Sequence, residues 1–328
     1  MCLKRFLLGR FLKVRELGMT TVAGSDNTSG SVMDQVGDYI IHHISNSDIH
    51  HPILQLPTIF GINFSVTKHV FMLWAVAAIV GMVVLIPVRS YLKRKNDVPK
   101  GMGNAVEAVV LFIRDSVVKP NVGPKWVDTW APIILTFFFF ILTANTIGLI
   151  PIFDILGAMG RLVFNVSPHN DHSLINALLH GGATATGNFV VTAALASITF
   201  VCIIIAGTKA HGFLQHWKNL VPHGLPFLVY IILIPIEIIS MFVKPFALTM
   251  RLAANMTGGH IAILAILSFI PIFAEVFHSL GAGIGIAAFS VPIATGLTGL
   301  EIIVTLVQAY VFTLLSAVFI GMAINVHH

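Results

Sequence analysis

Residues 237–260 read EIISMFVKPFALTMRLAANMTGGH and lie inside an apolar stretch that runs from about 224 to 273. A second apolar stretch follows, from about 284 to 326. An upright helix needs about 20 residues to cross a bilayer, so each stretch is too long for one upright span. Neither contains a charged break that would divide it into two spans. The two stretches therefore predict a pair of long helices that cross the membrane at a steep tilt or bend.

Prolines and glycines refine this picture of a hairpin. Pro235, Pro245 and Pro271 are candidate kink positions, because a membrane helix tolerates proline where it bends. The Gly-rich segment 281–285 is the predicted turn between the two long helices.

The composition of the whole chain also indicates a membrane protein. Of 328 residues, 56% are hydrophobic and 10% are charged, against about 25% charged in an ordinary soluble domain. This excludes a soluble enzyme and a disordered tail, and the two cysteines exclude a disulfide scaffold. The net charge of +5 comes from clusters at 4–15 and 89–100. These clusters flank hydrophobic segments, which is the positive-inside pattern, and no nucleic-acid partner is expected.

Three shorter apolar segments precede the hairpin, at about 69–88, 131–150 and 185–207. Basic residues after 88 and at 209–223 place those loops on the cytoplasmic or matrix side. Residues 101–118 mix charged and apolar side chains, as in an amphipathic helix on the membrane surface. We predict an all-α membrane protein with five membrane-embedded helices plus one amphipathic surface helix, the last two embedded helices forming a long tilted hairpin. A single domain, 38–328, would follow a flexible N-terminal extension, 1–37.

The polar residues of the first long stretch share one face. At about 100° per residue, they fall within a stripe about 80° wide, and they are Glu237, Ser240, Lys244, Arg251 and Asn255. His260 points to the opposite face from Arg251. In the second long stretch Glu301 and Gln308 are seven residues apart and share a face, so an antiparallel hairpin would bring them towards the groups around Arg251.

An arginine in the middle of a membrane costs about 2.5–3.5 kcal/mol and needs a partner. Glu237 lies about 21 Å along the helix from Arg251, too far for an ion pair. The spacing therefore points to a carboxylate on another subunit. Glu237 would lie on the inner side and the His260/Glu301 pair on the outer side. Carboxylates and imidazoles can pass protons, whereas an arginine between them stays charged and blocks direct leakage.

These motifs resemble subunit a of F-type ATP synthases. MRLAANMTGGH is similar to the family's Arg-Leu-x-x-Asn signature, with Arg251 at the essential arginine position, and EIIVTLVQAYVF places Glu301 and Gln308 at the family's spacing. The stretches IIHHI, AVEAVVLFIRD, ANTIGLIP and TGNFVVTAAL, at 40–44, 105–115, 144–151 and 186–195, extend the resemblance over about 38–325. Gly148 departs from it, because some bacterial members carry an acid there.

The resemblance implies proton translocation through two offset half-channels against a ring of c subunits. Its implied site residues are Arg251, Glu237, His260, Glu301, Asn255, Gln308, Ser240 and Lys244. It also implies b-type peripheral stalk subunits as partners, one copy per complex, and no catalysis by the chain itself. The chain would reside in the bacterial inner membrane or, alternatively, in the mitochondrial inner membrane.

Other interpretations of the sequence stay open. A secondary transporter or channel that works alone is the main alternative, and a membrane anchor is a third. Asn255 and Gln308 could simply hydrogen-bond between helices, and Lys244 could be structural. His169 and His172 could bind a metal, capture protons or lie in a solvated loop. The chain lacks the phosphate loop G-x-x-x-x-G-K-[ST], so we expect no ATP binding. We also expect no cofactor and no metal.

Overall fold

The computed structural model describes residues 36–37, 40–41, 58–59, 62–63, 65–93, 101–149, 184–218 and 226–325. Nearly all of the predicted extension, 1–37, and of the His169/His172 loop lies outside these residues. Five helices in the described part of the chain are long and apolar enough to cross a membrane. The prediction of an all-α membrane protein with five embedded helices is confirmed.

The elements follow one another in the predicted order. A short antiparallel pair, β1 (Thr58–Ile59) and β2 (Ile62–Asn63), places Thr58 opposite Asn63. The helices and helical turns are α3 (Lys68–Lys93), α4 (Met102–Phe112), η1 (Ile113–Val118), α5 (Lys119–Val122), η2 (Pro124–Trp126), α6 (Val127–Leu149), η3 (Ala185–Gly187), α9 (Phe189–His211), α10 (Phe213–Lys218), α11 (Phe227–Val276) and α12 (Leu280–Ile324). The three shorter predicted spans are α3, α6 and α9.

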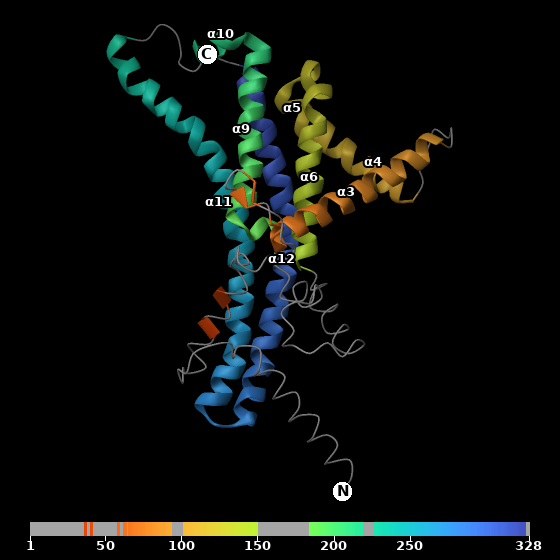
Figure 1. Ribbon diagram of the computed structural model, residues 1–328, viewed down its shortest axis with the longest axis vertical. Coiled ribbons are helices and arrows are strands. Elements are labelled where there is room, and N and C mark those ends of the chain that lie inside the picture. Colours follow the sequence, from red (N-terminus) through yellow and green to blue (C-terminus); the bar gives the residue numbers. More distant parts are fainter. Residues whose placement is uncertain are drawn as a thin grey trace.

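The predicted surface segment, 101–118, is helical from its second residue onward. It comprises α4 and the π-helical turn η1, and its sides differ as an amphipathic helix requires. Ile113 and Val117 are fully buried, whereas Glu107, Arg114 and Asp115 are exposed. Figure 1 shows α4 extending away from the central helices, beside α3.

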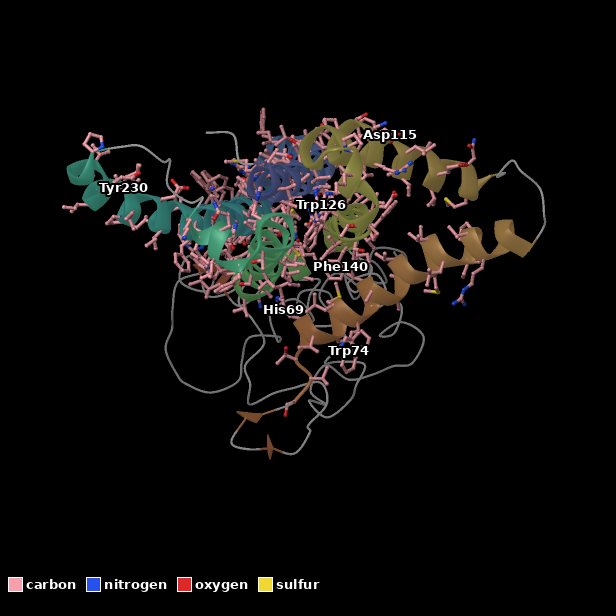
Figure 2. The ribbon with its side chains drawn as sticks, turned by 90° about the horizontal axis from the view of Figure 1, so that it is seen from above. His69, Trp74, Asp115, Trp126, Phe140 and Tyr230 are labelled. Atoms are coloured by element: carbon pink, nitrogen blue, oxygen red, sulfur yellow. The ribbon has the colours of Figure 1, made fainter. Side chains whose placement is uncertain are left out.

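The core lies where α6, α9 and α12 meet. Its fully buried side chains include Ile134 and Ile141 of α6 and Ile320 of α12. The ring of Phe137 in α6 meets Phe312 in α12 edge-on, with centroids 5.6 Å apart. This packing fixes α12 against the shorter spans. Figure 2, seen from above, shows Tyr230 far from this centre, near the start of α11, and Asp115 on another side of it.

The long hairpin is confirmed, but its predicted turn at 281–285 is wrong. The turn lies between α11 and α12 at Phe277–Ser279, where His278 has φ 44° and the Ser279 N–H donates to the Ala274 carbonyl at 3.1 Å. The glycines lie inside α12. A Cβ at Gly283 would come within 2.9 Å of the Ala274 Cβ. Glycine is present there because the two helices approach each other closely, and not because the chain turns.

Candidate functional site

Two polar pairs connect α11 and α12 in the middle of the hairpin. The Asn255 side-chain N–H donates to Gln308 Oε1 at 2.9 Å, and His260 Nδ1 lies 2.6 Å from Glu301 Oε1. Two helical turns separate Glu301 from Gln308, so both project from the same side of α12. The antiparallel hairpin brings Gln308 to Asn255, one of the groups around Arg251, as predicted, and it brings Glu301 to His260.

The α12 members of both pairs are removed from solvent. Glu301 and Gln308 are each 4% exposed, whereas His260 is half-buried. A buried carboxyl group needs a hydrogen-bonding or charged partner, and His260 is that partner here. An acid and an imidazole at this distance can share a proton and exchange it without rearrangement.

Gly259 is what allows the carboxyl group of Glu301 to reach His260. A Cβ at Gly259 would lie 2.8 Å from Glu301 Oε1 and 3.0 Å from its Cδ. The carboxyl group therefore lies directly against the α11 backbone. No such constraint acts at Gly258, where a Cβ would meet nothing within 4 Å. The predicted site did not include Gly259, although the Gly-Gly pair before His260 was visible in the sequence.

Arg251 lies on a different face from this pair, as the helical periodicity predicted. Its side chain is exposed, and it makes no hydrogen bond or ion pair with any residue that the structure describes. Its neighbours Leu252 and Met256 are fully buried. The arginine thus projects from a helix whose other side is held in the core.

The inner part of the predicted stripe is less tightly connected. Glu237, Ser240 and Lys244 are half-buried, and the Lys244 ammonium lies 6.0 Å from the centre of the Phe319 ring of α12. The structure does not bring Glu237 or Ser240 into contact with Arg251 or Asn255. Of the eight predicted site residues, four therefore form direct pairs and four line the same hairpin separately.

A second group of polar residues lies inside the bundle, and sequence reasoning missed its members on α6 and η3. Thr305 is 3% exposed and lies between Glu301 and Gln308 on α12. Asn145 of α6 accepts a hydrogen bond from Thr186 of η3, and both are fully buried. Within the described residues, the Thr305 hydroxyl and the Asn145 amide nitrogen have no partner. The signal available beforehand was the polar Asn145 within an apolar span.

The two helices that carry these groups are in register. About two turns beyond the Phe137–Phe312 contact, α6 presents Asn145 and α12 presents Thr305. They lie at a similar height, one turn from Glu301. The Thr257 hydroxyl of α11 donates to the Gly187 carbonyl at 3.1 Å, which holds η3 against the hairpin. Hydrogen bonds thus connect α6 to η3 and η3 to α11 in this part of the bundle.

Gly148 has a steric explanation. A Cβ at this position would overlap the side chain of Thr184, which precedes η3. The chain therefore has no room at 148 for the acid that the resemblance would allow.

The predicted basic loop at 209–223 is partly a folded element. His211 Nε2 lies 2.8 Å from the Ile324 carbonyl at the end of α12, and His216 in α10 is only 7% exposed. Burial, and to a smaller extent the neighbouring His211, lowers the pKa of His216. The other charged groups of this segment are Lys209 and Lys218, both exposed. The described residues contain no group of three or more metal-ligating side chains.

Comparisons with known proteins identify the family. A model of the family described as ATP synthase A chain matches residues 70–321. This chain belongs to the ATP synthase A chain family. It is 40% identical over 305 residues to ATP synthase subunit a 2 of Chlorobium luteolum, covering 90% of this chain and 78% of that protein. It is 41% identical over 278 residues to ATP synthase subunit a of Chloroherpeton thalassium, covering 83% and 71%. The matched region contains both polar pairs and Arg251, so the resemblance noted in the sequence is confirmed.

Proposed function

We propose that this chain translocates protons through two offset half-channels against a rotating c-ring. Membership of the ATP synthase A chain family makes it a multi-pass component of the membrane sector that carries protons. The single observation that carries the residue-level proposal is the 2.6 Å contact between the half-buried His260 and the buried Glu301 inside the hairpin.

The outer half-channel would lead to the His260–Glu301 pair. A proton arriving from outside would bind to one of these groups and pass to the other across their hydrogen bond. Thr305, Asn145 and Thr186 supply further hydrogen-bonding groups beside this path. Asn255 and Gln308, the next pair along the hairpin, would keep α11 and α12 in register while the proton leaves for a ring carboxyl group.

Arg251 would act on the ring. Its exposed guanidinium has no partner among the described residues, and an arginine stays charged at every physiological pH. It would attract an ionised carboxylate on a passing c subunit, and its charge would repel a proton moving directly between the half-channels. A neutralised carboxyl group could then rotate into the lipid.

The inner half-channel would use Glu237, Ser240 and Lys244, which share the Arg251 stripe on the inner part of α11. A ring carboxyl group that has nearly completed its turn would release its proton there. Each charge moved through 100 mV supplies about 2.3 kcal/mol, and the ring would deliver this energy to a separate catalytic head. The chain itself would catalyse no reaction and would be held by b-type stalk subunits. The relatives named above are bacterial, which favours a bacterial inner membrane.

The test uses the assembled complex reconstituted in vesicles. Arg251→Ala should abolish ATP-driven proton pumping, and Glu301→Gln should slow both pumping and coupled synthesis. Glu275→Gln is the matched control, because Glu275 is an exposed acid near the tip of the same hairpin. Normal pumping in Arg251→Ala, or equal effects of the two glutamine variants, would refute the proposal. Proton transport by the chain without a ring would favour the stand-alone transporter, which the family assignment does not support.

A further inference from the structure

The short helix α10 carries apolar side chains that nothing in the described part of the chain covers. Phe213, Leu214 and Trp217 are 62%, 75% and 42% exposed. At about 100° per residue they fall within an arc of about 100°, and Gln215 lies outside it. The rings of Phe213 and Trp217 meet edge-on at 6.4 Å. Three large apolar side chains therefore form one outward face, which we call the α10 face.

The chain holds this face in a fixed orientation. Gly212, at φ 87°, ends α9 and turns the chain into α10. The ring of His216 then packs on Gly207 of α9 so closely that a Cβ at 207 would overlap it. His216 is 7% exposed, and burial lowers its pKa. Contact of this buried ring with a glycine thus clamps α10 to the end of a membrane span.

The Lys, Arg, Asp and Glu residues that flank the α10 face along the sequence have a single sign of charge. Lys209 and Lys218 are exposed on either side of it, and the sequence contains no Asp or Glu between Asp171 and Glu237. α10 directly follows the span Phe189–His211, so it lies at the depth of the membrane interface. Tryptophan and lysine at that depth are typical of contact with headgroups. Figure 1 shows α10 at the end of α9 that is far from the tip of the hairpin.

We propose that α10 is a membrane anchor that inserts Phe213, Leu214 and Trp217 into the inner lipid interface and binds anionic headgroups through Lys209 and Lys218. The end of α9 that precedes α10 is also in contact with the end of the hairpin. His211 donates to the Ile324 carbonyl at 2.8 Å, and Asn325 donates to the Asn121 carbonyl of α5 at 3.2 Å. An anchor at this junction fixes the depth of the end of α12 in the membrane.

Site-directed spin labelling tests the anchor on the full chain. With Cys2 and Cys202 replaced, a nitroxide is attached through Leu214→Cys or through Gln215→Cys, and the chain is reconstituted in phosphatidylcholine vesicles with or without phosphatidylglycerol. The ratio of collisions with oxygen to collisions with a water-soluble nickel chelate should be several-fold higher at 214 than at 215. Both positions are exposed, so labelling should leave the fold intact.

Two further variants separate the parts of the proposal. Phosphatidylglycerol should raise the ratio of oxygen to nickel collisions at position 214 by strengthening the binding of α10 to the membrane, by a factor of about five per lysine. The double substitution Lys209→Gln and Lys218→Gln should remove this effect of phosphatidylglycerol. Gly207→Ala should displace His216 and release α10, so that the ratio of oxygen to nickel collisions becomes the same at positions 214 and 215. Equal nickel collisions at 214 and 215 in the unmodified background would overturn the anchor. Protection of 214 from both reagents in the assembled complex would overturn it in favour of a protein partner. The comparison of positions 214 and 215 in vesicles needs neither a ring nor proton transport, so its outcome is independent of the proposed function.

Discussion

The substitution Gly259→Ala tests the geometry of the outer pair with a single methyl group. In the native hairpin the carboxyl group of Glu301 lies against the α11 backbone at Gly259, and a Cβ there would lie 2.8 Å from Oε1. An ordinary contact between carbon and a heavy atom is about 3.5 Å. The carboxyl group would therefore have to retreat by about 0.7 Å.

That retreat is large compared with the hydrogen bond that it disturbs. His260 Nδ1 and Glu301 Oε1 are 2.6 Å apart, so a displacement of about 0.7 Å along the bond would stretch it to about 3.3 Å, beyond the usual N–H···O range. Losing a hydrogen bond that involves a charged group costs about 1.5–3 kcal/mol. If protons pass across this bond, the rate of proton uptake should fall by about 10- to 100-fold.

The measurement is ATP-driven acidification of vesicles that contain the assembled complex, together with the amount of complex assembled. Gly258→Ala is the matched control, since it adds the same methyl group to the same helix where nothing lies within 4 Å. Both variants gain about 1 kcal/mol of helix propensity, so only the steric term differs. Equal pumping in the two variants, at equal assembly, would refute the proposed role of the contact.

Three other outcomes follow from named contacts. A double-mutant cycle of Gln308→Leu and Asn255→Leu should give about 1 kcal/mol of coupling in thermal unfolding, because each removes the partner of a 2.9 Å hydrogen bond; purely additive losses would contradict this. Gly148→Ala should reduce the amount of folded chain in membranes because its methyl group overlaps Thr184, and wild-type abundance would argue against that packing. Burial in the docked helix lowers the pKa of His216 from 6.5. As the pH falls, the ring is therefore protonated in the undocked state before it is protonated in the docked state. The docking of α10 should therefore weaken as the pH falls below about 6.5. Hydrogen exchange of α10, corrected for its intrinsic pH dependence, should then accelerate, and a constant protection factor would contradict it.

The sequence predicted those parts of the site that depend on periodicity. The spacing of seven between Glu301 and Gln308, placed in an antiparallel hairpin, predicted that both would approach the part of α11 around Arg251. In the structure they pair there with His260 and Asn255. The five spans followed from length and apolar composition, and the surface helix followed from its mixed polarity. These features are local, because each depends on residues that are close in the chain or related by one simple turn.

Features that depend on close approach between distant segments could not be predicted. Asn145 and Thr186 are 41 residues apart, and nothing in either segment indicates the contact. The sequence alone does not show whether a glycine forms a turn of the chain or lets a neighbouring helix pack closely against the backbone. At 281–285 it was interpreted as a turn, yet Gly283 packs on α11. Likewise His216 belongs to a basic segment that looked solvated, and only the missing side chain at Gly207 allows it to be buried.

The scarcity of charge in the hairpin determines how it must lie in the bilayer. α12 has 45 residues, so it is about 68 Å long. Its ends are apolar and exposed, with Leu280 73% and Met322 54% exposed. Its one Asp, Glu, Lys or Arg is Glu301. Such a surface belongs in lipid along its whole length, and a bilayer about 30–45 Å thick can hold it only at a tilt of about 50–65°.

This tilt separates Arg251 and Glu301, the two charged residues at the centre of the proposed function, mainly within the plane of the membrane. Arg251 has 24 residues of α11 before it and 25 after it, and Glu301 has 21 residues of α12 before it and 23 after it. Both therefore lie near mid-bilayer. Nine residues along α11 separate Arg251 from His260, which is about 13.5 Å of helix. At the tilt derived above, that distance becomes about 6–9 Å in depth but about 10–12 Å sideways. A sideways offset is what lets a proton enter a rotating ring at one position and leave at another, so the same lack of charge that forces the hairpin to lie obliquely also sets its half-channels side by side.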